Sequence, residues 1–365
     1  MRVTVLSIET AKKLIINVLT ASELLQMARK NPPTRFIFLK KQPLTRSKKL
    51  AAEDISLAAF CFLATLTYFY SSKKKSEISP VLRLYTEGVK NHHSSFIIHH
   101  SSFIIIMTIP TMAVLAAEDR QPEILFWVGC AGSFDARAQK VTIAFSKILT
   151  EMSVDFAILG NEEMCTGDPA RRAGNEFVFQ MMALQNITTL NTYNVKKIVT
   201  ACPHCFNTLK NEYPALGGHY DVVHHTTFLQ SLINEGRLKI EGGAFKGRKI
   251  TYHDSCYIGR ANGIYEAPRE VLAQLDAELV ELKRCKTNGL CCGAGGGQMF
   301  KEDEPGTTRI NIARAEEILE TQATIVAANC PFCITMLSDG MKAKDKQDDV
   351  MVYDLSELIV NNNGW

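Results

Sequence analysis

The segment from Tyr252 to Cys333 decides the fold and the chemistry that this sequence predicts. It contains three cysteine groups: Tyr-His-Asp-Ser-Cys at 252–256, Cys-Cys-Gly at 291–293 and Cys-Pro-Phe-Cys at 330–333. Gaps of 34 and 37 residues separate the cysteines of successive groups. Thiolates are soft ligands suited to iron–sulfur clusters, zinc or copper(I), so cysteines drawn together from distant segments predict a metal site.

The same layout occurs once more upstream. Cys130, Cys165 and a Cys-Pro-His-Cys group at 202–205 lie 126, 126 and 128 residues before their counterparts in the later set. An internal repeat of that length predicts two related domains. We place the first cysteine-rich repeat at 107–245 and the second at 246–365.

Apolar runs alternate with helical patterns in both repeats, which predicts an α/β fold of two tandem pseudo-repeats. Each should hold a small parallel sheet with flanking helices, including one long helix over 168–190. Because loops that follow parallel strands meet at the carboxyl edge of a sheet, the cysteines of each repeat should gather there. The predicted strands lie at 124–128, 156–159, 197–200, 220–225, 249–253, 279–282, 324–328 and 351–354.

This pattern resembles the cysteine-rich CCG domain family. Its members include the B subunit of heterodisulfide reductase, the iron–sulfur subunit of glycolate oxidase and a lactate-utilisation iron–sulfur protein. The resemblance covers residues 107–365 and is complete in the second repeat. In the first repeat Thr166 stands where the second cysteine of the adjacent pair is expected, and the usual His-Asp-Pro-Cys reads His-Asp-Ser-Cys at 253–256.

The second repeat offers five candidate ligands, and a regular [4Fe–4S] cube needs four cysteines. The resemblance implies a non-cubane [4Fe–4S] cluster in which the extra thiolate opens the cube. A tetrahedral zinc site with one spare thiol is the alternative. Gly293 could supply an N–H group to the cluster, and His253 and Asp254 could orient a ligand or relay a proton. The ligand candidates are Cys256, Cys291, Cys292, Cys330 and Cys333.

The first repeat retains four cysteines, which suit zinc and an ordinary [4Fe–4S] cube equally well by their number. His204 lies inside its Cys-x-x-Cys group and could enter the site, because imidazole sometimes replaces thiolate. Both Cys-x-x-Cys groups should begin helices, where free N–H groups and the helix dipole favour thiolate. The ligand candidates here are Cys130, Cys165, Cys202 and Cys205.

Residues 1–106 differ from the rest of the chain. They contain a perfect tandem repeat, His-His-Ser-Ser-Phe-Ile-Ile at 92–98 and again at 99–105. A repeat of this kind ahead of Met107 predicts translated non-coding sequence, or at least a disordered extension, with the physiological start at Met107. The alternative is a single membrane helix over 55–70, although a spanning helix needs about 20 apolar residues.

The resemblance implies an iron–sulfur redox subunit of the heterodisulfide reductase or glycolate/lactate oxidase type. It would transfer electrons to or from a thiol/disulfide or an organic-acid-oxidising flavoprotein. The sequence lacks the C-x₂-C-x₂-C-x₃-C-P run of ferredoxins, so we expect a separate ferredoxin-like iron–sulfur subunit as partner. A zinc-stabilised interaction protein without enzymatic activity is the main alternative, and a metal-free thiol oxidoreductase using Cys330 and Cys333 is the other.

Charge and cysteine usage limit the partners and the compartment. The net charge of +3 divides into +10 for residues 1–106 and −7 for residues 107–365. A mildly acidic body gives no electrostatic reason to expect nucleic-acid binding. Eleven cysteines, nine of them at ligand spacings, with no cleavable signal sequence, predict a reducing cytoplasmic location. Membrane association would depend on residues 55–70.

Overall fold

A computed structural model of the chain describes residues 5–7, 94–100, 103–302 and 305–365. The chain divides into two compact units, Met1–Thr108 and Ile109–Trp365. The first contains strands β1 (Val5–Ser7), β2 (Ser94–His100) and most of β3 (Phe103–Ile109), in the order β1-β3-β2. Residues 55–70, for which a membrane helix was the alternative interpretation, lie outside the described residues. Among the helices that are described, none has the length and apolar character needed to cross a membrane.

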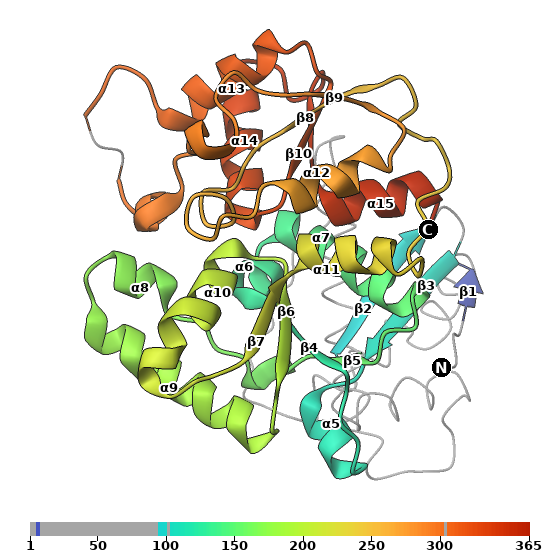
Figure 1. The fold of residues 1–365 in the computed structure, drawn as a ribbon, viewed down its shortest axis with the longest axis vertical. Coiled ribbons are helices and arrows are strands. Elements are labelled where there is room, and N and C mark those ends of the chain that lie inside the picture. Colours follow the sequence, from blue (N-terminus) through green and yellow to red (C-terminus); the bar gives the residue numbers. More distant parts are fainter. Residues whose placement is uncertain (1–4, 8–93, 101–102, 303–304) are drawn as a thin grey trace, which may run out of the picture. The chain divides into compact units, whose positions relative to one another are not determined.

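The second unit contains two four-stranded sheets of identical topology, and every neighbouring pair of strands is parallel. The first sheet has the order β5-β4-β6-β7, and the second has the equivalent order β9-β8-β10-β11. This confirms the predicted tandem α/β repeats (Figure 1). The strands are β4 (Ile124–Trp127), β5 (Phe156–Ala157), β6 (Lys197–Thr200), β7 (Asp221–His224), β8 (Lys249–Tyr252), β9 (Glu278–Val280), β10 (Ile325–Ala328) and β11 (Met351–Asp354).

Four helices pack across the boundary between the repeats as two equivalent pairs. Helix α7 (Ala136–Glu151) contacts α15 (Leu355–Asn363), and α11 (His225–Asn234) contacts α12 (Glu266–Ala273). Each pair joins the helix after the first strand of one repeat to the helix after the last strand of the other. The two helix pairs are therefore equivalent under the internal repeat of the sequence. All four helices are labelled in Figure 1.

Buried polar contacts reinforce this interface. On α7, Arg137 donates two hydrogen bonds of 2.8 and 2.7 Å to the Glu357 carboxylate on α15. At the ends of β7 and β11, His225 Nε2 lies 3.0 Å from Asp354 Oδ1, and both side chains are fully buried. His225 Nδ1 lies 3.2 Å from His224 Nε2. These contacts hold the two repeats together as one compact unit.

The structure corrects one predicted helix. The segment over 168–190 forms two helices, α8 (Asp168–Arg172) and α9 (Glu176–Thr192), instead of one. Gly174 between them has φ of +84°, a left-handed conformation that glycine adopts without strain. Asn175 then caps α9, because its side chain accepts a 3.2 Å hydrogen bond from the Val178 N–H.

The remaining helices flank the sheets or cover the cysteine groups. One of them, a short helix directly after β4, was not predicted and contains Cys130. They are α5 (Met112–Ala117), α6 (Gly129–Phe134), α10 (Pro203–Asn207), α13 (Ile310–Glu320) and α14 (Pro331–Ala343).

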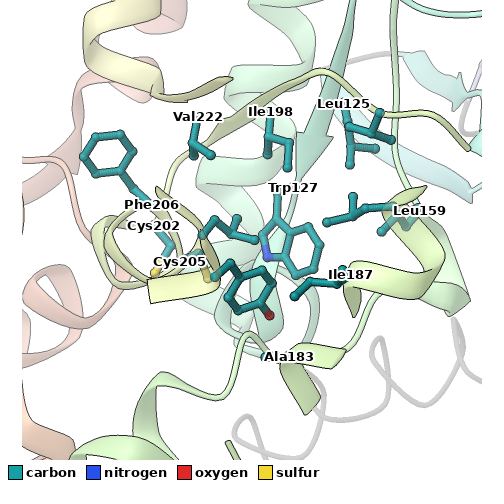
Figure 2. Packing of buried hydrophobic residues seen from close by; sticks show 14 of the residues in the cluster. Leu125, Trp127, Leu159, Ala183, Ile187, Ile198, Cys202, Cys205, Phe206 and Val222 are labelled. Atoms are coloured by element: carbon teal, nitrogen blue, oxygen red, sulfur yellow. The ribbon is translucent and has the colours of Figure 1, made fainter. Parts of the chain in front are cut away.

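The two Cys-x-x-Cys groups are part of the apolar core. Figure 2 shows Trp127, at the end of β4, surrounded by aliphatic side chains and by Cys202 and Cys205. The same core cluster extends into the second repeat, where it includes Cys330 and Cys333. Burial of both groups in one continuous core excludes bulk water from the sulfur atoms.

Candidate metal centre

The second repeat brings its five predicted cysteines together. Cys292 Sγ and Cys333 Sγ are 3.3 Å apart, and side-chain hydrogen bonds connect the cysteines in a chain. The order along that chain is Cys256, Cys291, Cys292, Cys333 and Cys330. Each group directly follows a parallel strand or its loop, which is why segments far apart in sequence meet at one edge. All ten cysteines in the described part of the chain are free thiols.

Local backbone conformation brings two glycines close to these sulfurs. Gly293 donates its N–H to Cys291 Sγ at 3.3 Å, and its φ is +95°. A methyl group added at Gly295 would lie 3.9 Å from Cys291 Sγ and 4.0 Å from Cys256 Sγ. The Cys-Cys-Gly loop therefore offers main-chain N–H groups to the cysteine sulfurs; that Gly293 donates to a cluster stays a prediction.

The environment of the sulfurs favours thiolate at two positions. Hydrogen bonds from Cys256 and then Cys292 hold the pKa of Cys291 well below its usual value. Burial raises the pKa of Cys330, but hydrogen bonds from Cys333 and His204 outweigh burial and lower it to about 5. Cys330 is the N-cap residue of α14 and Cys202 is that of α10. This confirms that both Cys-x-x-Cys groups begin helices.

His253 lies beside the sulfurs of the second site. One of its ring nitrogens, Cys292 Sγ and Cys333 Sγ are all within 4.8 Å of one another. Arg314 Nε donates to His253 Nδ1 at 3.1 Å, while His253 Nε2 is buried without a hydrogen-bond partner among the described residues. Burial, followed by the charge of Arg314, lowers the pKa of His253 to about 3. The imidazole is therefore neutral at physiological pH.

Asp254, the next residue, holds the surrounding backbone instead of touching the sulfurs. Its carboxylate accepts hydrogen bonds of 2.9 and 3.0 Å from Arg269, and both side chains are buried. It also accepts a 2.7 Å hydrogen bond from the Lys286 N–H. Lys286 precedes the Cys-Cys-Gly loop, so this contact ties that loop to the end of β8.

The first repeat assembles its four cysteines around one small cavity. The lining also includes Thr166 and Phe332, the latter contributed by the second repeat. Thr166 Oγ1 donates to Cys205 Sγ at 3.9 Å, and Gly167 N donates to Cys165 Sγ at 3.4 Å. The four cysteines of this cavity are Cys130, Cys165, Cys202 and Cys205.

Glu163 organises the start of α6, which carries Cys130. Its carboxylate accepts hydrogen bonds from the N–H groups of Val128 (3.0 Å) and Gly129 (2.5 Å). Burial raises the pKa of Glu163 to about 7, although these two N–H groups oppose that increase. The carboxylate thus connects the loop before Cys165 to the turn that holds Cys130.

His204 lies between the two sites. Its Nδ1 is 2.9 Å from Asp168 Oδ2, and the side chain also hydrogen-bonds to Cys330 of the second repeat. Burial opposes protonation, but the hydrogen bonds to Asp168 and Cys330 hold the pKa of His204 well above its usual value. Its ring packs against Tyr257 and Phe332, with centroids 4.4 and 4.9 Å apart. We predicted a place for His204 in the first site only, and the structure gives it contacts with both.

Sequence inspection missed four side chains that support the sites. Arg314, Arg269, Asp168 and Glu163 belong to no cysteine motif and lie on loops or helices remote from their partners. Of the four, only Arg314 had a signal in the sequence, because it is a charged residue on the apolar face of a helix, α13. The structure shows that it is fully buried. A buried arginine requires a partner, and that partner could not be identified from spacing.

The residues present fit a metal–sulfur group. Nine soft sulfur donors gather in two sites, and none is joined to another in a disulfide. Three buried polar nitrogens near them have no partner in the described residues: Trp127 Nε1, His253 Nε2 and Asn329 Nδ2. Unpartnered buried N–H groups beside thiols are expected where an acceptor such as a metal-bound sulfur binds.

Comparison with known proteins defines the family. A cysteine-rich domain (CCG) model matches residues 124–210 and 250–338, one match in each repeat. The chain belongs to this family of cysteine-rich CCG proteins.

Three known proteins are similar in sequence to this chain. The "Probable iron-sulfur-binding oxidoreductase FadF" of Bacillus subtilis (strain 168) is 47% identical over 255 residues, covering 70% of this chain and 36% of the relative. The EtfAB:quinone oxidoreductase of Syntrophomonas wolfei is 42% identical over 252 residues, covering 67% and 35%. A component of the dihydromethanophenazine:CoB–CoM heterodisulfide reductase of Methanosarcina barkeri is 36% identical over 250 residues, covering 66% and 59%. The chain thus spans between about a third and three fifths of each relative.

Proposed function

We propose that this protein is an iron–sulfur redox subunit that transfers electrons through cysteine-bound clusters. The observation that carries the proposal is the convergence of five cysteines in the second repeat, two of whose sulfurs are 3.3 Å apart. Thiolates in this number exceed the needs of a structural zinc ion, which takes four ligands. The names of the relatives, which include an iron–sulfur-binding oxidoreductase and a component of a heterodisulfide reductase, support the same class.

In the second repeat we assign the ligands of a [4Fe–4S] cluster, non-cubane because of the fifth thiolate. When bound, such a cluster supplies one-electron transfer. The protein contributes the thiolates, the Gly293 N–H and, around Cys292, Cys330 and Cys333, a buried environment. The ligands are Cys256, Cys291, Cys292, Cys330 and Cys333.

In the first repeat we propose either a regular [4Fe–4S] cube or a zinc ion. Thr166 takes the position of the fifth cysteine and its hydroxyl already donates to Cys205. Four thiolates satisfy both alternatives, and only the cube would give this repeat a redox role. The ligands are Cys130, Cys165, Cys202 and Cys205.

The partners of the redox step are proposed from the resemblance and from the relatives. A separate ferredoxin-like iron–sulfur subunit would exchange electrons with the clusters, and a flavoprotein or a thiol/disulfide would be the other electron donor or acceptor. One relative is named for electron transfer between EtfAB and quinone, and another for reduction of a heterodisulfide. The free cysteines suit a reducing cytoplasmic location.

Domain boundaries complete the proposal. We place the two cysteine-rich domains at 107–245 and 246–365, with translation starting at Met107. Mass spectrometry of the native N-terminus tests this start, and peptides from residues 1–106 would refute it.

An anaerobic redox titration tests the function. Protein purified without oxygen is reduced stepwise with dithionite and reoxidised with a soluble acceptor, while absorption and EPR spectra are recorded. We expect reversible uptake of one electron per cluster. Colourless protein that contains zinc alone and takes up no electrons would favour a zinc-stabilised interaction protein. Electron uptake by a cysteine disulfide without any metal would favour a thiol oxidoreductase.

A further inference from the structure

The two ring nitrogens of His253 face different surroundings. Arg314 is fully buried and its Nε lies 3.1 Å from His253 Nδ1. A guanidinium group carries only donors, so Nδ1 must accept this hydrogen bond through its lone pair. The proton of the neutral imidazole is therefore on Nε2, which makes Nε2 a donor.

This donor has no partner within the described protein. His253 is fully buried, its Nε2 makes no hydrogen bond there, and one of its ring nitrogens lies within 4.8 Å of Cys292 Sγ and Cys333 Sγ. A buried N–H that gives up water without a replacement destabilises the fold. A sulfur of the metal group, bound among the cysteines beside the ring, would supply the acceptor that is missing.

The assignment of Nδ1 as acceptor and Nε2 as donor also argues against His253 as a metal ligand. Histidines that bind metal through one nitrogen usually donate the N–H of the other to an acceptor. Here the other nitrogen, Nδ1, already accepts from Arg314. Binding a metal through Nε2 would require an imidazolate, whereas donating an N–H requires only the neutral ring.

The first repeat has a donor at the equivalent position. Trp127 precedes His253 by 126 residues, the same offset that relates Cys130 to Cys256. Its indole Nε1 is buried and has no partner in the described part of the molecule. Figure 2 shows this nitrogen on the side of the ring toward Cys202 and Cys205. An indole N–H can only donate.

We propose that each repeat carries a built-in N–H donor to the sulfurs of its metal group, His253 Nε2 in the second and Trp127 Nε1 in the first. Arg314 acts as a positioning residue, because it fixes the tautomer of His253 without touching the sulfurs. The inference rests on the proposed iron–sulfur function. Donors to cluster sulfurs stabilise the more negative, reduced state, so both side chains raise the reduction potential of their clusters.

The direct test is pulsed EPR on reduced protein labelled with ¹⁵N-histidine. We expect nitrogen couplings to the second-site cluster from two histidines, because His204 also hydrogen-bonds to Cys330. The His253 coupling should persist in His204→Phe and be lost in the double variant His204→Phe/His253→Phe. The coupling should be weak, as for a hydrogen bond and not for a directly bound nitrogen. Because the His204→Phe protein keeps His253 and every proposed cysteine ligand, its spectrum decides the matter even if the His253→Phe substitution removes the cluster.

Potentiometry gives the functional readout. His253→Phe should make the second-site potential more negative by about 59 mV, a tenfold change in a one-electron equilibrium, while His253→Gln, which keeps an N–H donor, restores part of it. Trp127→Phe should shift only the first-site signal, if that site holds iron.

Three outcomes would overturn the proposal. Iron-loaded His204→Phe protein without histidine coupling, or a second-site potential unchanged in His253→Phe, refutes the donor role alone. Strong coupling typical of direct ligation refutes it in favour of a nitrogen ligand. Protein that binds no iron refutes the proposed function and this inference with it, so the two failures are distinguishable.

Discussion

The first repeat places a hydroxyl where the second places a thiol. Thr166 Oγ1 lies 3.9 Å from Cys205 Sγ, and at the equivalent position Cys292 Sγ lies 3.3 Å from Cys333 Sγ. Strand order and strand direction are the same in both repeats. One side chain therefore separates a four-sulfur site from a five-sulfur site on a common scaffold, which makes each repeat a control for the other.

The repeats also differ in how an acid holds the cysteine loops. In the first, Glu163 from the loop before Cys165 accepts N–H groups of the turn after β4. In the second, Asp254 from the turn after β8 accepts the N–H of Lys286 in the facing loop. The direction of the contact is reversed, yet both join the same two segments. The geometry of the cysteines is thus maintained while the supporting residues change.

Removal of one proposed ligand of the second site should have the largest effect. Cys256→Ala should remove the EPR signal of the five-cysteine cluster from the second repeat and leave the metal of the first in place, because Cys256 hydrogen-bonds within the second group. Metal analysis and EPR of the anaerobic variant measure this. Cys285→Ala is the matched control, since Cys285 lies outside the sulfur chain, and it should retain all metal. Equal loss in both variants would contradict the assignment.

A reciprocal exchange should interconvert the two sites. Cys292→Thr gives the second site the ligand set of the first, and Thr166→Cys gives the first site a fifth thiol. We expect the EPR signal of the second site to acquire the character of a regular four-cysteine cluster in Cys292→Thr. The first site should gain a five-thiolate signal in Thr166→Cys. Spectra unchanged in both variants would show that the fifth position is not a ligand.

Loss of the buried ion pair should weaken the second repeat selectively. Arg269→Met leaves Asp254 buried without its cation, which typically costs about 3–5 kcal/mol. The first repeat has Val128 at the position of Asp254, so stabilisation by this ion pair is a feature of the second repeat alone. Urea unfolding measures the change. Lys346→Met, which removes an exposed ion pair with Asp349, should leave the free energy of unfolding unchanged.

Acid should weaken the contact between the repeats through His224. Burial and then the neighbouring His225 hold the pKa of His224 well below its usual range. An unfolded histidine has a pKa of about 6.5, so the unfolded state binds the proton first as pH falls. Stability is therefore complete above about pH 6.5 and decreases below it by about 1.4 kcal/mol per pH unit.

Urea unfolding between about pH 7.5 and 5.5, on either side of the ordinary histidine pKa, tests this, with His224→Gln as the variant. The variant should lose this part of the pH slope, about one proton, whereas His219→Gln at an exposed position should retain it. Identical slopes for all three proteins would show that His224 is protonated equally in both states.

Much of the fold was predictable because its signals are local. All eight strands of the body were expected from short apolar runs, and the observed strands fall within or within one residue of those ranges. The topology then brought the cysteines together, because parallel strands place their following loops at one edge. The break between α8 and α9 had a signal as well, Gly174 followed by Asn175, and the helical pattern around them obscured it.

The side chains that hold the site residues in place could not be predicted from the spacing of residues in the sequence. The contact of Arg314 with His253 joins residues 61 positions apart, and that of His225 with Asp354 joins residues 129 apart. Neither pair belongs to a periodic pattern. The place of His204 between the sites depends on how the repeats pack, which no single repeat encodes. Such contacts are decided by tertiary packing, so the sequence alone could not show which of these residues contact one another.

The most direct test is the iron, sulfide and zinc content of anaerobically prepared protein, measured together with its EPR spectrum. About four to eight iron atoms are expected, corresponding to one or two [4Fe–4S] clusters. A signal from the five-cysteine site that disappears in Cys256→Ala would support the central claim that the second repeat holds a redox cluster. Stoichiometric zinc without iron, and no paramagnetic signal after oxidation or reduction, would contradict it.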